Sequence, residues 1–306
     1  MQYTANQPDL TKFDILKAYI KYGAMTARTY FDMVRLLRKK YDNYLSVAYH
    51  LKRKQFPINA KLKDGTEKGF NRQEEVWADI RNLSYNVDSD ILVIDDIKLK
   101  GGATFGDINN IFINKDYSFL PLKGRIIIDI GANIADSSIY FIQKGAEKVY
   151  AVEPNRVLYE LAVTNIRLNS MSNHIETVFA GCSSKTSRDS DPPFLTLEEL
   201  VSSCVITPDF LKLDCEGCEY DIIMNTPDNI LAAFSYIFVE YHYGYRNIKR
   251  RLEGCGFKVE ASEPTYYPQN NLATNLNTRF STSNSRVETV SLIKPFVGLL
   301  YASKTA

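Results

Sequence analysis

The chain lacks any run of 18 apolar residues, and its first four residues lack the apolar stretch of a secretory signal. We therefore expect no transmembrane helix and, by default, a cytoplasmic protein. Excess charge is also missing, because 37 basic and 36 acidic side chains leave a net charge of +1. This balance argues against a dedicated nucleic-acid binder. Cysteine is sparse: the five are odd in number and mostly widely spread, which fits a reducing compartment.

What is present is enough apolar material for a core, at 45% of 306 residues. This length suits one large or two small domains. The most informative stretch is 125–155, where an apolar run meets a glycine turn, an amphipathic segment follows, and a second apolar run ends in Glu153. Gly131 allows the backbone to turn tightly after the first run. The pattern predicts strand, turn, helix and strand, the first βαβ unit of a nucleoside-binding Rossmann-like domain.

The residues of this unit also indicate the kind of nucleoside. Dinucleotide folds use three glycines to admit a diphosphate, but here the third position is Ala135 and an acid, Asp136, follows. Asp136 and Asp129 favour a positively charged ligand. Glu153, at the expected spacing of about 20 residues, can accept both ribose hydroxyls. S-adenosylmethionine has a ribose and a sulfonium but no phosphate, so it fits; the alternative is a tight βα connection without a ligand.

A second group of acids lies in residues 211–219. Asp129, Glu153, Asp214 and Glu240 each end a predicted strand, and the carboxyl ends of parallel strands meet at one edge of a sheet. We therefore expect these four carboxylates to converge on one crevice. Glu216 and Glu219 have the alternative role of starting a helix.

These motifs carry a family resemblance. The chain resembles the FkbM-type S-adenosylmethionine-dependent methyltransferases over about residues 105–260, with weaker similarity back to 57. The matching stretches are 128–134, 152–155, 195–200, 211–219 and 239–242, and the most family-specific is Lys-x-Asp-x-Glu-Gly-x-Glu at 212–219. The family usually carries glycine where this chain has Ala135.

The resemblance implies a class I methyltransferase fold, an α/β Rossmann-like sheet of seven mostly parallel strands with an antiparallel last strand. It also implies S-adenosyl-L-methionine as cofactor, with its methionine end on the loop after the first strand, its ribose on Glu153 and its sulfonium beside Asp214. The predicted cofactor-binding residues are Asp129, Gly131, Ala132, Asn133, Glu153, Pro154, Asn155 and Asp214.

An oxygen acceptor must lose its proton during methyl transfer, and the candidate bases are His242 and Asp214. An ordinary histidine pKa near 6.5 suits this role, although His242 could equally be a hydrogen-bonded structural residue. By family analogy we expect O-methylation of a hydroxyl on a small molecule or saccharide. Two alternatives stay open: a nicotinamide-dependent oxidoreductase, and a non-catalytic Rossmann-like binding module.

The one close cysteine pair is Cys215 and Cys218. A zinc site needs four ligands, and no second Cys or His pair stands at ligand spacing, so we predict no metal. Redox pairs of this form normally occur in a different βαβ context. We predict two packed thiols whose pKa values the neighbouring acids raise.

Residues 11–54 are predicted to be helical, with a break at Gly23. A heptad-like stripe recurs at spacings of four and three in a segment that is also basic. We weigh three roles: packing on the helix's own domain, a homo-oligomer through the 24–54 helix, and contact with an anionic membrane or polyanion. The stripe residues are Tyr30, Val34, Leu37, Tyr41, Tyr44, Ala48 and Leu51.

The rest of the chain divides into three predicted regions: a basic helical region at 1–56, a sheet extension or linker at 57–104, and the methyltransferase domain at 105–306. A hairpin around Asp64-Gly65, a helix near 74–83 and strands at 91–98 and 110–114 precede the glycine turn. Strands and helices then alternate, which predicts a mostly parallel sheet. Residues 261–292 are polar and without periodicity, so they form either a lid or a disordered loop.

Overall fold

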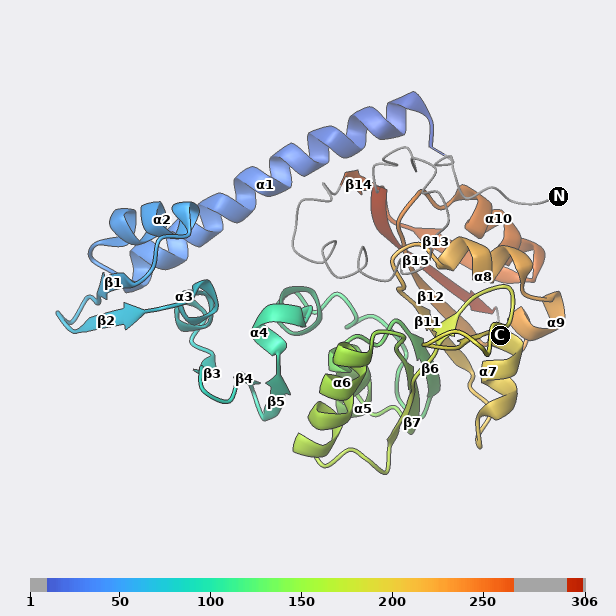
Figure 1. The fold of residues 1–306 in the computed structure, drawn as a ribbon. Helices are drawn as coiled ribbons and strands as arrows, with labels where there is room; N and C mark the ends of the chain where they lie inside the picture. The colour runs from blue at the N-terminus through green and yellow to red at the C-terminus, as the bar shows by residue number, and fades with distance from the viewer. Residues whose placement is uncertain (1–9, 267–295, 305–306) are drawn as a thin grey trace.

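The computed structural model describes residues 10–266 and 296–304, and a twisted central sheet dominates it (Figure 1). Its strands lie in the order β13-β15-β12-β11-β6-β7-β8, and β14 (Thr265–Tyr266) pairs with β15. All neighbours are parallel except β15, which runs antiparallel to β12 and β13. The strands span β6 Ile126–Ile130, β7 Lys148–Val152, β8 Ile175–Val178, β11 Phe210–Leu213, β12 Tyr236–Tyr241, β13 Phe257–Ala261 and β15 Phe296–Lys304. This order and the single reversed strand are the predicted class I methyltransferase topology.

The central strands are apolar on both faces because helices cover both. Successive strand residues point to opposite faces, so Ile127 and Phe210 enter one core while Ile128 and Leu211 enter the other. The helical layers are α5 Asp136–Gln143, α6 Arg156–Leu168, α7 Leu197–Ser203, α8 Glu219–Asn225, α9 Asp228–Leu231 and α10 Arg246–Gly254; two short strands, β9 Gly181–Cys182 and β10 Phe194–Leu195, pair beside them.

The amino-terminal region has a small core of its own. It contains α1 Lys12–Lys40, α2 Tyr44–Arg53, α3 Gln73–Ile80 and the predicted hairpin, β1 Ile58–Lys61 with β2 Glu67–Phe70. Leu37, Tyr41, Val47, Ile58 and Val76 are buried together. A separate three-stranded sheet follows, β3 Ser84–Asn86, β4 Ile91–Ile94 and β5 Ile97–Lys100, then α4 Gly102–Phe105. Neither small sheet pairs with the central one.

Three local predictions are wrong. Helix α1 passes through Gly23 without a break, because one exposed glycine costs a helix only about 1 kcal/mol. The heptad stripe is not one helix face: Tyr41 is extended and ends α1, so the stripe is split between α1 and α2. Its buried members, Leu37, Tyr41 and Ala48, pack inside their own region, and the continuous helix on which self-association was predicted does not exist.

The predicted strand at 110–114 is instead a π-helix, Asn109–Ile113. Its apolar run is too short for periodicity to separate strand from helix. Ile111 is buried against the central domain, and the Phe112 ring lies 5.8 Å from that of Tyr140 on α5. Packing on α5 decides the conformation.

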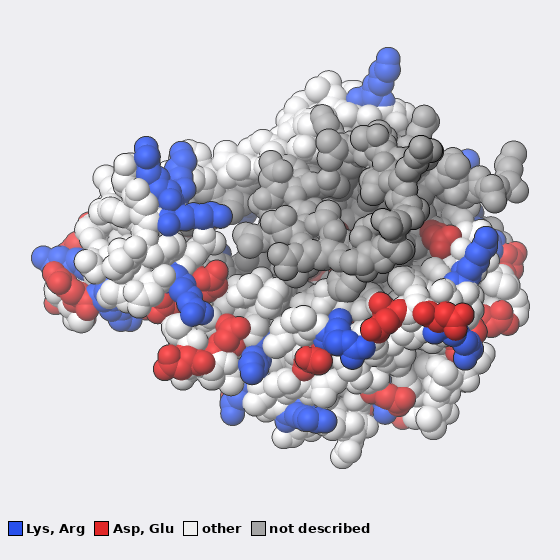
Figure 2. All heavy atoms as spheres, viewed as in Figure 1, with Lys and Arg blue, Asp and Glu red and all other residues white. Residues whose placement is uncertain are grey.

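The amino end of α1 returns to the central domain, so this helix bridges the two regions (Figure 1). Asp14 lies 2.6 Å from the Arg246 guanidinium of α10, and the Tyr19 ring lies 4.5 Å from that of Tyr266. No described helix is long and apolar enough to cross a membrane. Basic and acidic side chains are interspersed on the face in Figure 2, as the balanced composition predicts.

Candidate active site

The loop from β6 to α5 passes very close to the tip of β11. Gly131 has a φ of +81°, and a Cβ built on it would lie 1.8 Å from the carbonyl oxygen of Asp214. The amides of Gly131 and Ala132 both donate to the Val152 carbonyl at the tip of β7. The loop is therefore fixed between two neighbouring strand tips, and only glycine fits at its first position.

Ala135 ends this loop in the left-handed conformation, with a φ of 65°, at the N-cap of α5. A residue with a Cβ pays roughly 1–2 kcal/mol there. This conformation gives a physical reason why a glycine is usual at the position. Ala135 is fully buried, so its methyl group packs inside the domain rather than on the loop surface.

Glu153 lies at the tip of β7, and its carboxylate ties that tip to the glycine loop. It accepts the amides of Asn133 at 2.9 Å and Asn155 at 2.7 Å. Burial raises its pKa to about 7. Asn133 donates through Nδ2 to the Phe105 carbonyl at 2.7 Å, whereas its buried Oδ1 has no hydrogen-bond partner among the described residues. Two acceptor groups thus stand side by side.

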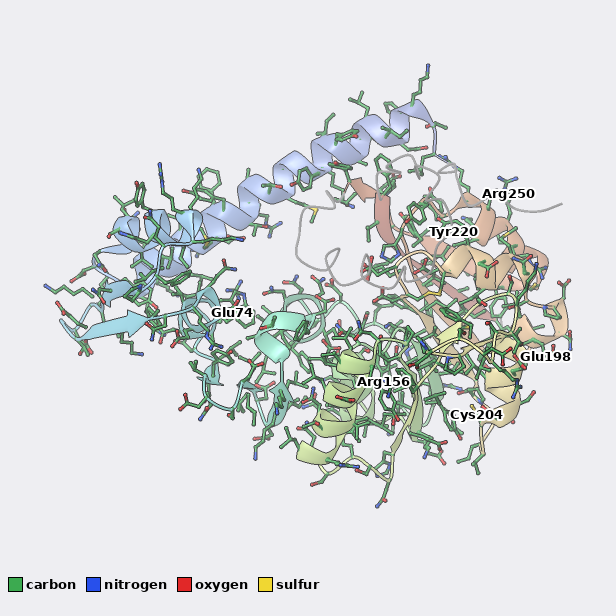
Figure 3. All side chains as sticks on the ribbon, viewed as in Figure 1. Glu74, Arg156, Glu198, Cys204, Tyr220 and Arg250 are labelled. Carbon is green, nitrogen blue, oxygen red and sulfur yellow. A yellow bond between two sulfur atoms is a disulfide. The ribbon has the colours of Figure 1, made fainter. Side chains whose placement is uncertain are left out.

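The next two predicted cofactor residues continue the chain from Glu153. Asn155 caps α6 by accepting the amides of Val157 and Leu158, so its side chain starts a helix, and Pro154 lies between the two. Figure 3 labels Arg156 at the start of this helix.

Lys212 is a residue that the sequence reasoning did not single out, although the 212–219 motif contains it. Its ammonium group, with 2% of the side chain exposed, lies 3.0 Å from Asp129 and 3.6 Å from Asp214, and donates to the Gly131 carbonyl at 3.0 Å. Burial opposes its charge, but Asp129 and Asp214 raise its pKa above the ordinary value. The sequence does carry a sign of this role, because Lys212 is the one charged residue in the otherwise apolar strand 210–213.

Asp129 forms an ion pair with Lys212 inside the domain and does not reach the surface. It is 0% exposed, and its Oδ2 accepts the hydroxyls of Ser137 and Ser138 at 2.7 Å each. The carboxylate of Asp129 is buried as the counter-ion of Lys212, and its contact with a ligand stays a prediction. Of the four strand-tip acids predicted to converge on one crevice, Asp129, Glu153 and Asp214 lie around the glycine loop, and Glu240 lies beside Asp214.

A second carboxyl pair lies at the start of α5. Asp136, which is 2% exposed, accepts the amide of Asp107 at 2.6 Å. Burial first, and then the nearby Asp107 charge, raise the pKa of Asp136 to about 7. Burial likewise raises the pKa of Asp107 to about 6. Asp107 stands outside the recognised motifs, and only the fold brings it here.

The raised pKa of Asp136 predicts a pH dependence of stability. The folded state keeps the proton above the ordinary pKa of 3.8, so this group stabilises the fold at low pH, and its contribution is lost as the pH rises through about 7. Relative to wild type, Asp136→Asn should gain on the order of 2–4 kcal/mol in free energy of unfolding between pH 4.5 and pH 8. Urea unfolding across this range measures it. The exposed Asp189→Asn is the control, and parallel curves for Asp136→Asn and wild type would contradict the assignment.

His242 follows the tip of β12 and is 4% exposed. Its Nδ1 lies 3.1 Å from Glu219 and its Nε2 lies 3.4 Å from Glu216. Burial opposes a charge on the ring, but the hydrogen bond and charge of Glu219, together with Glu216, raise the pKa of His242 to about 10. A protonated imidazole cannot accept a proton, so the role of His242 as general base stays a prediction that requires this ring to lose its proton.

A disulfide and a tyrosine hydrogen bond hold the loop that follows β11. Cys215 and Cys218 form a disulfide, so the prediction of two packed free thiols is wrong. Tyr220, labelled in Figure 3, donates its hydroxyl to the Gly244 carbonyl beyond β12. The acidic loop and the His242 segment are thus tied together.

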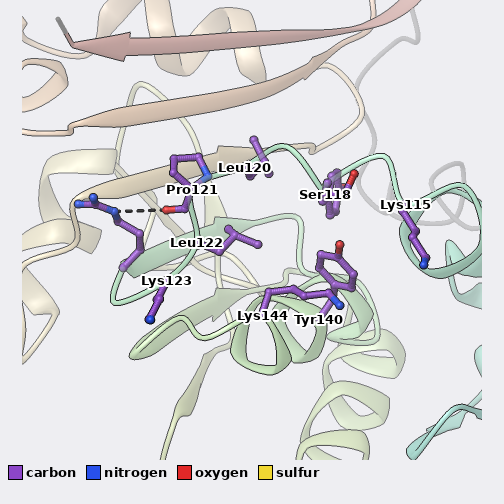
Figure 4. Close-up of a pocket in the computed structure, with 10 residues that line it drawn as sticks. Lys115, Ser118, Leu120, Pro121, Leu122, Lys123, Tyr140 and Lys144 are labelled. Carbon is purple, nitrogen blue, oxygen red and sulfur yellow. Dashed lines mark hydrogen bonds between the residues drawn. The ribbon is translucent and has the colours of Figure 1, made fainter.

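A cavity of about 460 Å³ lies elsewhere, at the amino end of β6 (Figure 4). Lys123 and Arg125 precede that strand, and Lys144 lies at the end of α5. The strand-tip acids occupy the opposite, carboxyl edge, where ligands bind in open α/β sheets. This cavity is therefore separate from the candidate active site.

The strand order and the glycine loop define a class I methyltransferase fold. Residues 205–259 match the family described as the Methyltransferase FkbM domain. This segment, which contains β11 and the acidic loop, is similar to that family, and the resemblance seen in the sequence is confirmed there.

Two similar proteins are named as methyltransferases, and a third was solved with S-adenosyl-homocysteine. A segment of 57 residues is 37% identical to protein arginine N-methyltransferase 6 of Danio rerio, covering 19% of this chain and 16% of that relative's length. The precorrin-6y C5,15-methyltransferase of Geobacter metallireducens has 16% identity and a TM-score of 0.36, over 60% of this chain and 81% of that one. TrmK of M. capricolum, solved with S-adenosyl-homocysteine, has 14% identity and a TM-score of 0.42, over 63% and 68%.

Proposed function

We propose that this chain is an S-adenosylmethionine-dependent methyltransferase. The observation that carries the proposal is the pair of acceptors, the Glu153 carboxylate and the unpartnered Asn133 Oδ1, beside a glycine loop at the carboxyl edge of the sheet. Glu153 stands where an acid accepts ribose hydroxyls in Rossmann-like folds. The amino group of the cofactor is a donor that would satisfy Asn133.

The charge around the loop favours this cofactor over a dinucleotide. Asp107, Asp136 and Asp214 stand near the loop, and the ammonium of Lys212 is already bound by carboxylates. A diphosphate would enter among acids, whereas an ammonium and a sulfonium are attracted there.

When bound, S-adenosylmethionine supplies an activated methyl group, so the protein mainly aligns the reactants. Holding them in line can lower the barrier by about 7–11 kcal/mol in favourable cases. The Gly131 loop and Glu153 hold the cofactor in this proposal. Asp214, whose side chain is 25% exposed, faces the acceptor side and orients an acceptor hydroxyl. We propose a small molecule or saccharide as the acceptor.

Calorimetric titration tests the cofactor. S-adenosylhomocysteine should bind the full chain and NADH should not; the reverse result would favour a nicotinamide-dependent oxidoreductase. Turnover is then measured as S-adenosylhomocysteine formation with a panel of hydroxylated acceptors. Cofactor binding with no turnover on any acceptor would favour a non-catalytic binding module.

Glu153→Ala should weaken S-adenosylhomocysteine binding by about 10–100-fold, because each hydrogen bond to a charged group contributes roughly 1.5–3 kcal/mol. Glu160→Ala, an exposed glutamate on the following helix, is the matched control and should bind as wild type does. Equal affinity for Glu153→Ala and the control would remove the ribose role.

A further inference from the structure

Three potential metal ligands meet beside the proposed acceptor position. Asp214, Glu240 and His242 each offer one ligand atom, and these atoms lie within 4.8 Å of one another. The sheet explains why. Strands β11 and β12 pair in parallel with Leu213 opposite Val239, so the next residues, Asp214 and Glu240, stand side by side at the carboxyl edge. His242 is two residues beyond Glu240, on the same side of an extended chain.

Glu240 makes no direct polar contact in the described part of the chain. Its carboxylate is partly buried and has no hydrogen bond or ion pair among residues 10–266 and 296–304. Lys212 already pairs with Asp214 at 3.6 Å, so a cation bound between the two strand tips would add a positive partner for Glu240.

The orientation of His242 is an independent indication. Its Nδ1 is held by Glu219, which is 0% exposed and lies outside the ligand group. Metal-binding histidines characteristically donate one ring N–H to a carboxylate, which leaves the other nitrogen for the ion. The other nitrogen, Nε2, lies 3.4 Å from the exposed carboxylate of Glu216, and the ring stands beside Asp214 and Glu240, so an ion bound there would replace the proton on Nε2.

We propose that Asp214, Glu240 and His242 bind a divalent cation of the Mn²⁺ type. Carboxylates suit Mn²⁺ and Mg²⁺, and one imidazole favours a transition metal over Mg²⁺. Ligands on opposite sides of an ion at about 2.1 Å each would be about 4.2 Å apart, so small side-chain movements suffice. The prediction of no metal considered only the cysteine pair, whereas these ligands come from two strand tips.

This inference rests on the proposed function and narrows it. A cation at this position would lie next to the acceptor and would polarise an oxygen bound there, which favours hydroxyl acceptors. Methyl transfer then forms a carbon–oxygen bond and breaks the carbon–sulfur bond. The electron pair of that bond stays on sulfur, and the hydroxyl proton passes to solvent.

The test is titration of the EDTA-treated full chain with Mn²⁺. Binding is measured as the decrease in the electron paramagnetic resonance signal of the free ion. We expect one ion per chain, and at least tenfold weaker binding for both Glu240→Gln and Asp214→Asn. Glu260→Gln, which changes an exposed glutamate on the edge strand β13, is the matched control and should bind as wild type does. Circular dichroism confirms that each variant is folded, and if one is not, the other decides.

Absence of binding to wild type at millimolar Mn²⁺, or equal binding by folded Glu240→Gln, would overturn the site. Titration of the EDTA-treated protein with S-adenosylhomocysteine separates this failure from failure of the proposed function. Cofactor binding without Mn²⁺ binding would leave the methyltransferase proposal intact and remove the metal. Mn²⁺ binding without cofactor binding would support the metal site and remove the methyltransferase proposal.

Discussion

Lys212→Met should lower the free energy of unfolding by about 3–5 kcal/mol. The substitution keeps the length of the side chain but removes the charge, which leaves Asp129 without its counter-ion. Asp129 is 0% exposed, and breaking a buried ion pair by removing one partner carries a cost of this size. Domains are typically stable by only about 5–15 kcal/mol, so the variant would lose a large share of its stability. Urea denaturation measures the change.

The matched control is Lys258→Met on β13. Lys258 pairs with Glu260 at 2.8 Å, but both side chains are about two-thirds exposed, at 66% and 68%. Exposed pairs contribute roughly 0–1 kcal/mol. If Lys212→Met were as stable as this control, the ammonium group would not be the tie between β6 and β11 that we describe.

Gly131→Ala should reduce S-adenosylhomocysteine affinity by about 100-fold or more. The new methyl group would lie 1.8 Å from the Asp214 carbonyl oxygen, so either the loop or the β11 tip must move. The left-handed backbone adds about 1–2 kcal/mol of strain, and overpacking typically adds about 1–3 kcal/mol. Displacing the loop separates it from Glu153, and calorimetric titration would detect the loss.

Gly254→Ala is the control for this substitution. Gly254 lies in α10 with nothing within 4 Å of a built Cβ, so alanine should be tolerated there. Unchanged cofactor affinity in a folded Gly131→Ala variant would show that the close approach of this loop to β11 has no part in binding.

The sequence predicted the features that depend on local pattern. The apolar runs that end in acids became β6, β7, β11 and β12, and the amphipathic stretch after the glycine turn became α5. Parallel pairing then brings the strand-tip acids together without further information. For this reason the alternation of strands and helices could be predicted from local pattern, and the class I topology followed from the family resemblance; the position of the site stays a prediction.

The sequence could not show what depends on contacts between distant residues. The pairing of Lys212 with Asp129 requires the register of β11 against β6. The charged state of His242 requires Glu219, which contacts it from the start of α8. Residues 261–292 were predicted to be a lid or a disordered loop. Only 261–266 lie within the described part of the chain, and the rest of this segment lies outside it.

The most direct test of the central claim is a crystal structure of the full chain with S-adenosylhomocysteine. We expect the ribose hydroxyls within hydrogen-bond distance of the Glu153 carboxylate, the amino group near Asn133, and the sulfur beside Asp214. A ligand bound away from the Gly131 loop, or a ribose that does not contact Glu153, would contradict the account.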